Sequence, residues 1–131
     1  MAPRTRILLI DDNEDYLQVL TVRLRTDGFE VVTANSGQGG LRILASEPFD
    51  LILLDMLMPE KDGITTYEEI RANPKTQQIP LILLTGVAVE GHWQPMANES
   101  DGRAFVMGKP YNYVELVARI NLVLTRAKGA S

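Results

Sequence analysis

Five short, strongly apolar runs recur along this chain and set the tightest limit on how it can fold. They are Arg6 to Ile10, Glu30 to Ala34, Asp50 to Leu54, Pro80 to Leu84 and Ala104 to Met107. Several runs show no polar alternation, which is typical of strands buried on both faces of a sheet. Between the runs, helical periodicity appears at residues 14–25, 37–46, 62–72 and 112–127, and more weakly near 90–99.

This alternation predicts an α/β fold: a doubly wound, five-stranded parallel sheet built as (βα)5. Right-handed crossovers would bring the carboxyl ends of the strands to one edge, where such sheets bind ligands. A chain of 131 residues with 45% hydrophobic content supports one core. We therefore expect a single domain over residues 1–131, with its core at about 4–127 and a short flexible tail at 128–131.

Composition excludes several classes of protein. The chain has no cysteine, so it has neither a disulfide framework nor a thiolate zinc site, and we expect it in the cytoplasm. No apolar stretch approaches the roughly 20 residues of a membrane helix, so no membrane contact is expected. A net charge of −4 argues against broad nucleic-acid binding, which leaves a protein as the expected partner.

Charged and hydroxyl side chains stand where the apolar runs end. Asp11 and Asp12 close the first run, Asp55 follows the third, Thr85 the fourth, and Lys109 stands just beyond the fifth. Three carboxylates at one edge would repel by about 4 kcal/mol per pair at 4 Å and an effective dielectric near 20. A hard cation such as Mg²⁺, which prefers oxygen ligands, removes that repulsion. Asp12 and Asp55 are the candidate direct ligands.

The same set of side chains suits phosphoryl transfer. A carboxylate can attack phosphorus and form an aspartyl phosphate, and Asp55 is the natural acceptor. The Thr85 hydroxyl can donate to one phosphoryl oxygen, and Lys109 can supply a positive charge to another.

The chain resembles the CheY-like response-regulator receiver domains of two-component signalling over nearly its whole length. The matching motifs are Leu9-Ile10-Asp11-Asp12-Asn13, Leu54-Asp55-Met56-Leu57-Met58-Pro59-Glu60-Lys61-Asp62-Gly63, Leu84-Thr85-Gly86 and Lys109-Pro110-Tyr111. Each motif alone is weak, and all four in order form a specific signal. The resemblance implies a flavodoxin-like sheet with strand order 2-1-3-4-5.

The resemblance also implies roles for individual residues. Asp55 would take a phosphoryl group from the phosphohistidine of a histidine kinase or a histidine phosphotransfer protein. Asp12, Asp55 and the backbone carbonyl of Leu57 would hold Mg²⁺, and Asp11 would act through a bound water. The bond before Pro110 would be cis, keeping Lys109 aimed inward; an X-Pro bond makes that isomer accessible.

Each of these residues also has a plain structural interpretation. Asp11 and Asp12 could cap the following helix, because Asp is favoured at an N-cap and near the positive end of the helix dipole. Asp55 could be a turn acid, Thr85 could merely end a strand, and Lys109 could be an ordinary surface lysine. Taken together, the residues favour the site.

The segment between residues 86 and 106 departs from the family. Gly91, Pro95 and Gly102 interrupt the expected fourth helix, so we expect that helix to be short, displaced or mobile. The family's switch aromatic stands three residues before the lysine, where this chain has Val106 with Phe105 beside it. Either a bulge brings Phe105 into the switch role, or the usual threonine–aromatic coupling is absent.

Two helix faces are candidate partner surfaces. On the first helix Tyr16 and Val19 project away from the core face and are the expected docking residues for the phosphodonor. On the last helix Val114, Ala118 and Leu122 form a second apolar stripe, which fits either a wide apolar face or a homodimer contact.

The leading hypothesis is a stand-alone phosphoacceptor switch that signals to an unknown downstream protein and catalyses only its own phosphorylation and dephosphorylation. One alternative is a receiver-like interaction module that no longer exchanges phosphate. Another is a flavodoxin-like cofactor binder or small hydrolase, by analogy of fold alone.

Overall fold

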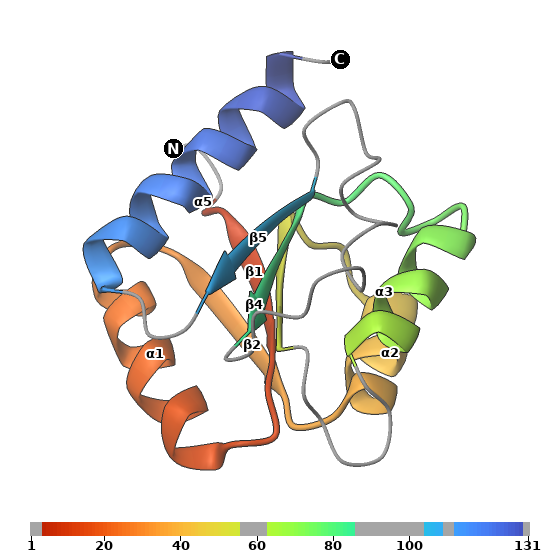
Figure 1. Ribbon diagram of the computed structural model, residues 1–131, viewed down its shortest axis with the longest axis horizontal. Coiled ribbons are helices and arrows are strands. Elements are labelled where there is room, and N and C mark those ends of the chain that lie inside the picture. The colour runs from red at the N-terminus through yellow and green to blue at the C-terminus, as the bar shows by residue number, and fades with distance from the viewer. Residues whose placement is uncertain (1–3, 56–62, 86–103, 109–111, 130–131) are drawn as a thin grey trace.

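Five parallel strands form the centre of the molecule, and helices cover both faces of the sheet (Figure 1). The computed structural model describes residues 4–55, 63–85, 104–108 and 112–129. The strands are β1 (Arg6–Ile10), β2 (Glu30–Ala34), β3 (Leu51–Asp55), β4 (Leu81–Thr85) and β5 (Ala104–Gly108). The helices are α1 (Glu14–Thr26), α2 (Gly37–Ser46), α3 (Gly63–Ala72) and α5 (Tyr113–Gly129). The strand order β2-β1-β3-β4-β5 confirms the predicted doubly wound α/β sheet.

The predicted boundaries of β1, β2 and α2 match the observed ones, and those of the other described elements differ by one or two residues. The third and fourth strands each begin and end one residue later than predicted. Asp50 lies just before β3, where its carboxylate accepts a hydrogen bond from the backbone N–H of Arg6 at 2.8 Å and its own N–H donates to the Arg6 carbonyl at 2.9 Å. Asp55 does join, with its backbone in register with Leu84. The weaker helical segment at 90–99 lies outside the described residues.

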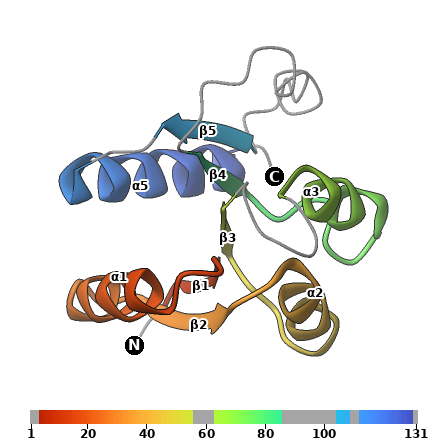
Figure 2. The same ribbon diagram turned by 60° about the horizontal axis from the view of Figure 1, so that its bottom comes forward.

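Two hydrophobic cores lie on opposite faces of the sheet, because successive strand side chains point to opposite sides. One core packs beneath α1 and α5 and includes Leu9, Leu53 and Ile82. The other packs beneath α2 and α3 and includes Leu8 and Ile52. Figure 2 shows the two helix pairs on either side of the strands. The side chains of β1 and β3 are buried on both faces of the sheet, which explains why polar and apolar residues do not alternate along these strands.

Capping side chains and glycine conformation define the ends of the first two helices. Asn13 caps α1, its side chain accepting a hydrogen bond from the backbone N–H of Tyr16. After α1 the chain turns at Gly28, whose φ of 96° lies in the left-handed region that favours glycine. Ser36 caps α2 in the same way as Asn13, accepting from the N–H of Gly39.

Helix α2 approaches β1 so closely that only glycine fits at position 40. A Cβ atom at Gly40 would stand 2.4 Å from Cδ1 and 2.9 Å from Cγ1 of Ile10. Ile10 is fully buried, so its side chain has little room to move aside. The contact sets the spacing between this helix and the strand that leads to Asp11.

Arg6 joins several segments at the amino edge of the sheet. Its guanidinium donates to Glu30 at 2.6 Å, to Glu47 at 2.7 Å and to the carbonyl of Pro48 at 2.6 Å. It also lies over the ring of Phe49, 4.7 Å from the centroid. The hydrogen bond to Glu47, and then that to Glu30, raise the pKa of Arg6 above its ordinary value. One side chain therefore links β1 with β2 and with the connection from α2 to β3.

The beginning of α5 is fastened to the end of α1, and Figure 1 shows these two helix ends side by side. The Tyr113 hydroxyl donates to Asp27 at 2.6 Å, and the Arg23 guanidinium lies 4.2 Å from the Tyr113 ring centroid. Burial, followed by the hydrogen bond to Asp27, raises the pKa of Tyr113 to about 12.

No described helix is both long enough and apolar enough to cross a bilayer.

Candidate functional site

Three carboxylates meet at the carboxyl edge of the sheet. Ligand oxygens of Asp11, Asp12 and Asp55 all lie within 4.8 Å of one another. Asp11 and Asp55 are buried, with 1% and 6% of their surfaces exposed, while Asp12 is exposed. Among the described residues this is the only group of three or more acidic, histidine or cysteine side chains placed to hold a metal ion. The predicted convergence of these acids is therefore observed.

Backbone hydrogen bonds hold the acidic loop at the end of β1. The N–H of Asp11 donates to the carbonyl of Ala34 at 3.1 Å, which continues the pairing with β2 past the end of β1. The Asp11 carboxylate accepts from the N–H of Asn13 at 2.9 Å. The interpretation of Asp11 and Asp12 as helix caps is wrong, since Asn13 occupies the N-cap of α1. Asp11 and Asp12 remain outside the helix.

The donor set fits a hard divalent cation. Carboxylates whose oxygens lie within 4.8 Å of one another repel, by about 4 kcal/mol for a pair at 4 Å and an effective dielectric near 20. Mg²⁺ accepts one or two carboxylates together with waters and phosphate oxygens. Asp11, Asp12 and Asp55 could together hold such an ion, and direct coordination by Asp12 and Asp55 with Asp11 acting through water stays a prediction.

The strand register brings the other predicted residues toward the same edge. Asp55 ends β3 beside Leu84, and Thr85 ends β4 beside Gly108 of β5. Lys109 follows Gly108 directly in the sequence. The Thr85 side chain, Leu57, Lys109 and Pro110 lie outside the described residues, so their assigned roles, including the cis bond at Pro110, stay predictions.

Of the two alternatives for the switch aromatic, the structure does not form the bulge. The register between β4 and β5 runs without interruption from Leu81 opposite Ala104 to Thr85 opposite Gly108. Phe105 packs against the core under α1 and α5, with the Arg119 guanidinium 5.0 Å from its ring centroid. The Val106 side chain lies outside the described part of the chain, so the loss of threonine–aromatic coupling stays a prediction.

The predicted docking residues on α1 differ in exposure. Val19 is 61% exposed, as expected from its place on the helix. Tyr16 was expected to project away from the core but instead packs against it, with its hydroxyl oxygen buried. The long aromatic ring reaches back toward the sheet, which helical periodicity alone does not capture. Val19 therefore remains the stronger candidate for a partner contact.

The last helix shows the two predicted stripes. Leu116, Ile120 and Val123 are fully buried, whereas Val114 is 76% exposed and Leu122 39% exposed. The apolar face of α5 is thus only partly covered by its own domain. Whether it pairs with another chain is a separate prediction.

One polar contact beside the acids was missed from the sequence. The Asn35 side chain, just after β2, donates to the Glu14 carboxylate at the start of α1 at 3.1 Å. Asn35 is brought there by the pairing of Ala34 with Ile10, so the only available signal was a polar residue following the neighbouring strand.

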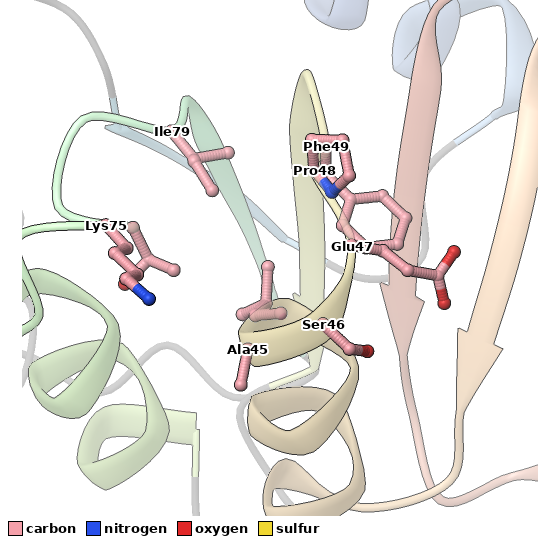
Figure 3. Close-up of a pocket in the computed structure, with 9 residues that line it drawn as sticks. Ala45, Ser46, Glu47, Pro48, Phe49, Lys75 and Ile79 are labelled. Carbon is pink, nitrogen blue, oxygen red and sulfur yellow. The ribbon is translucent and has the colours of Figure 1, made fainter.

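A shallow pocket of about 320 Å³ lies at the opposite, amino edge of the sheet, between the ends of α2 and α3 (Figure 3). Its lining includes Ala45, Phe49, Lys75 and Ile79. In Figure 3 the Glu47 and Ser46 side chains point away from Lys75. Because the pocket lies at the edge of the sheet opposite to the acids, it takes no part in their chemistry.

Comparisons with known proteins agree with this geometry. The family model for the response regulator receiver domain matches residues 7–121. The transcriptional regulatory protein CpxR of Klebsiella pneumoniae is 38% identical over 93% of this chain, and the chain spans 50% of that protein's length.

Solved structures show the same architecture. A response regulator receiver domain protein (CheY-like) from Methanospirillum hungatei superposes with a TM-score of 0.86 at 26% identity, covering 98% of this chain and 100% of the other. The response regulator TrrA of Thermotoga maritima, solved in complex with Mg²⁺ and BeF, gives a TM-score of 0.75 at 30% identity, covering 91% and 98%. The fold, the acid cluster and the family match agree, and the chain belongs to the response regulator receiver domain family.

Proposed function

We propose that this domain is a phosphoacceptor switch of a two-component phosphorelay, with Asp55 as the acceptor. The observation that carries the proposal is the convergence of Asp11, Asp12 and Asp55 within 4.8 Å in a chain of the receiver family. Asp55 ends a strand whose other residues are fully buried, so its carboxylate is held on a rigid element. Rigid placement lowers the cost of orienting a nucleophile.

In the proposed reaction an oxygen of Asp55 attacks the phosphorus of a phosphohistidine. The new O–P bond forms as the P–N bond breaks, and the electron pair of that bond returns to the imidazole of the donor. A bound Mg²⁺, of the kind reported with TrrA, would offset charge developing on the phosphoryl oxygens. Thr85 would donate a hydrogen bond to one of those oxygens, and Lys109 would place its charge beside another.

The donor in this proposal is a histidine kinase or a histidine phosphotransfer protein, and the output is a change in contact with a downstream protein. The domain catalyses only its own phosphorylation and dephosphorylation and is not otherwise an enzyme. A chain without cysteine suits the reducing cytoplasm, where we place the reaction. Action without an effector domain, and without nucleic-acid contact, stays a prediction.

Phosphorylation of the purified protein tests the proposal. Wild type and Asp55→Asn are incubated with acetyl phosphate, with and without Mg²⁺, and resolved by Phos-tag electrophoresis. We expect a shifted band only for wild type with Mg²⁺. The isosteric change to Asn removes the nucleophile at nearly constant shape. An unshifted wild type under all conditions would favour an interaction module that no longer exchanges phosphate.

A further inference from the structure

The Asn35–Glu14 contact stands beside the acid cluster and has no role in the proposed chemistry. Glu14 lies two residues after Asp12 and carries another carboxylate at the start of α1. The described cluster nevertheless contains only Asp11, Asp12 and Asp55. One Glu14 oxygen accepts the hydrogen bond from the Asn35 amide at 3.1 Å.

Asn35 is held in place independently of Glu14. The backbone N–H of Asp11 donates to the carbonyl of Ala34, the residue before Asn35. Ser36, the residue after it, caps α2 through the N–H of Gly39 at 3.0 Å. Its backbone is therefore fixed on both sides, so the Asn35 amide is a donor presented to the first turn of α1 by a rigid neighbour.

The number of carboxylates available to the ion affects which cation the cluster favours. Mg²⁺ requires near-octahedral geometry, keeps several waters and accepts only one or two carboxylates, whereas Ca²⁺ takes six to eight oxygen ligands in flexible geometry. A fourth carboxylate would therefore add more to Ca²⁺ binding than to Mg²⁺ binding.

We propose that Asn35 is a positioning residue that holds the Glu14 carboxylate away from the acid cluster and so biases the site toward Mg²⁺ over Ca²⁺. The inference rests on the proposed function, because it concerns the ion that would serve phosphorylation at Asp55. The hydrogen bond from Asn35 favours one position of the Glu14 carboxylate, so the bias is limited to the net free energy of that single bond. This corresponds to about threefold to tenfold in relative affinity.

The test measures ion binding by the unphosphorylated protein, with no phosphodonor present. Amide NMR titrations with MgCl₂ and CaCl₂ give the two dissociation constants for wild type, Asn35→Ala, Glu14→Gln and the double variant. We expect Asn35→Ala to tighten Ca²⁺ binding by about threefold to tenfold and to change Mg²⁺ binding by less than about twofold. The double variant should return to the wild-type ratio of affinities.

Glu14→Gln is the matched control. Glutamine keeps an oxygen that can accept from Asn35 but loses the charge, so both affinities should fall by a similar factor and the ratio should hold. An unchanged ratio of Ca²⁺ to Mg²⁺ affinity in Asn35→Ala would overturn the inference. A rise in that ratio in the double variant as large as in Asn35→Ala would also overturn it, because the rise would then not depend on the Glu14 carboxylate. Equal weakening of both ions in Asn35→Ala would show a merely structural role and also overturn it. If wild type bound no Mg²⁺, the proposed function itself would fail, and the first titration would show this.

Discussion

The close approach of α2 to β1 makes Gly40→Ala a sharp test of the packing behind the site. The added Cβ would stand 2.4 Å from Cδ1 of Ile10, which is fully buried, so the helix, the strand or the isoleucine must shift. Overpacking of this kind costs about 1–3 kcal/mol. Alanine regains about 0.5–1 kcal/mol as a better helix former than glycine. From the middle of these two ranges, the expected net loss in the free energy of unfolding is about 1 kcal/mol.

Urea denaturation followed by circular dichroism measures this loss. The midpoint should fall while the slope with denaturant stays unchanged, because the surface exposed on unfolding is nearly the same. The thermal midpoint should drop by about 4 °C for a domain of 131 residues.

Ile10→Val supplies the second arm of a double-mutant cycle, because it removes the Cδ1 atom that meets the new Cβ. In that background Gly40→Ala should cost about 1 kcal/mol less than in wild type. A Gly40→Ala protein that is more stable than wild type, as propensity alone predicts, would refute the close packing. Independent effects of the two substitutions would refute the assigned contact.

Three further predictions follow from surface contacts. Folding raises the pKa of Tyr113 to about 12 from an ordinary value near 10, so the folded state binds more protons in this window and stability falls as pH rises through it. Tyr113→Phe should remove that fall and, by losing the hydrogen bond to Asp27, cost about 1 kcal/mol near neutral pH. Urea denaturation across pH measures both effects, and an unchanged alkaline profile would contradict the raised pKa of Tyr113. Val19→Glu should slow phosphotransfer from a histidine donor at least several-fold while leaving acetyl phosphate labelling intact, and equal rates from the donor would remove Val19 from the docking surface. If the exposed stripe of α5 pairs two chains, sedimentation with beryllofluoride should show a dimer that Leu122→Glu abolishes; a monomer at high concentration in wild type would exclude it.

The sheet was predictable from sequence because its strands are apolar on both faces and end in polar residues. The boundaries of β3 moved by one residue, since two aspartates flank the run and hydropathy treats them alike. The two aspartates differ in the structure: the Asp50 side chain accepts a hydrogen bond from the Arg6 backbone before β3 begins, while Asp55 is the last residue of β3 and lies in register with Leu84 of β4.

The acid cluster was also predictable, because parallel strands bring their carboxyl ends to one edge. The side chains around it were harder to place. Tyr16 follows the helical period of an outward residue, yet its ring packs on the core. Asn35 meets Glu14 only because β2 lies beside β1, and no local pattern encodes that pairing. Gly40 marks a close helix–strand approach that composition does not reveal.

The contacts around Arg6 and Asp50 carry a consequence for the alignment of the central strands. A slip of β1 against β3 by one residue would exchange the faces of every side chain, and in most sheets the loss of hydrophobic burial forbids it. Here Leu8, Leu9, Leu53 and Leu54 are fully buried whichever way they point, so apolar character barely distinguishes the slipped pairing from the native one. The distinction falls to the polar pair at the amino edge, where Arg6 and Asp50 exchange hydrogen bonds at 2.8 and 2.9 Å. The hydrogen bonds between Arg6 and Asp50 therefore favour the native register of β1 against β3, and with it the meeting of the acids at the opposite end of these strands.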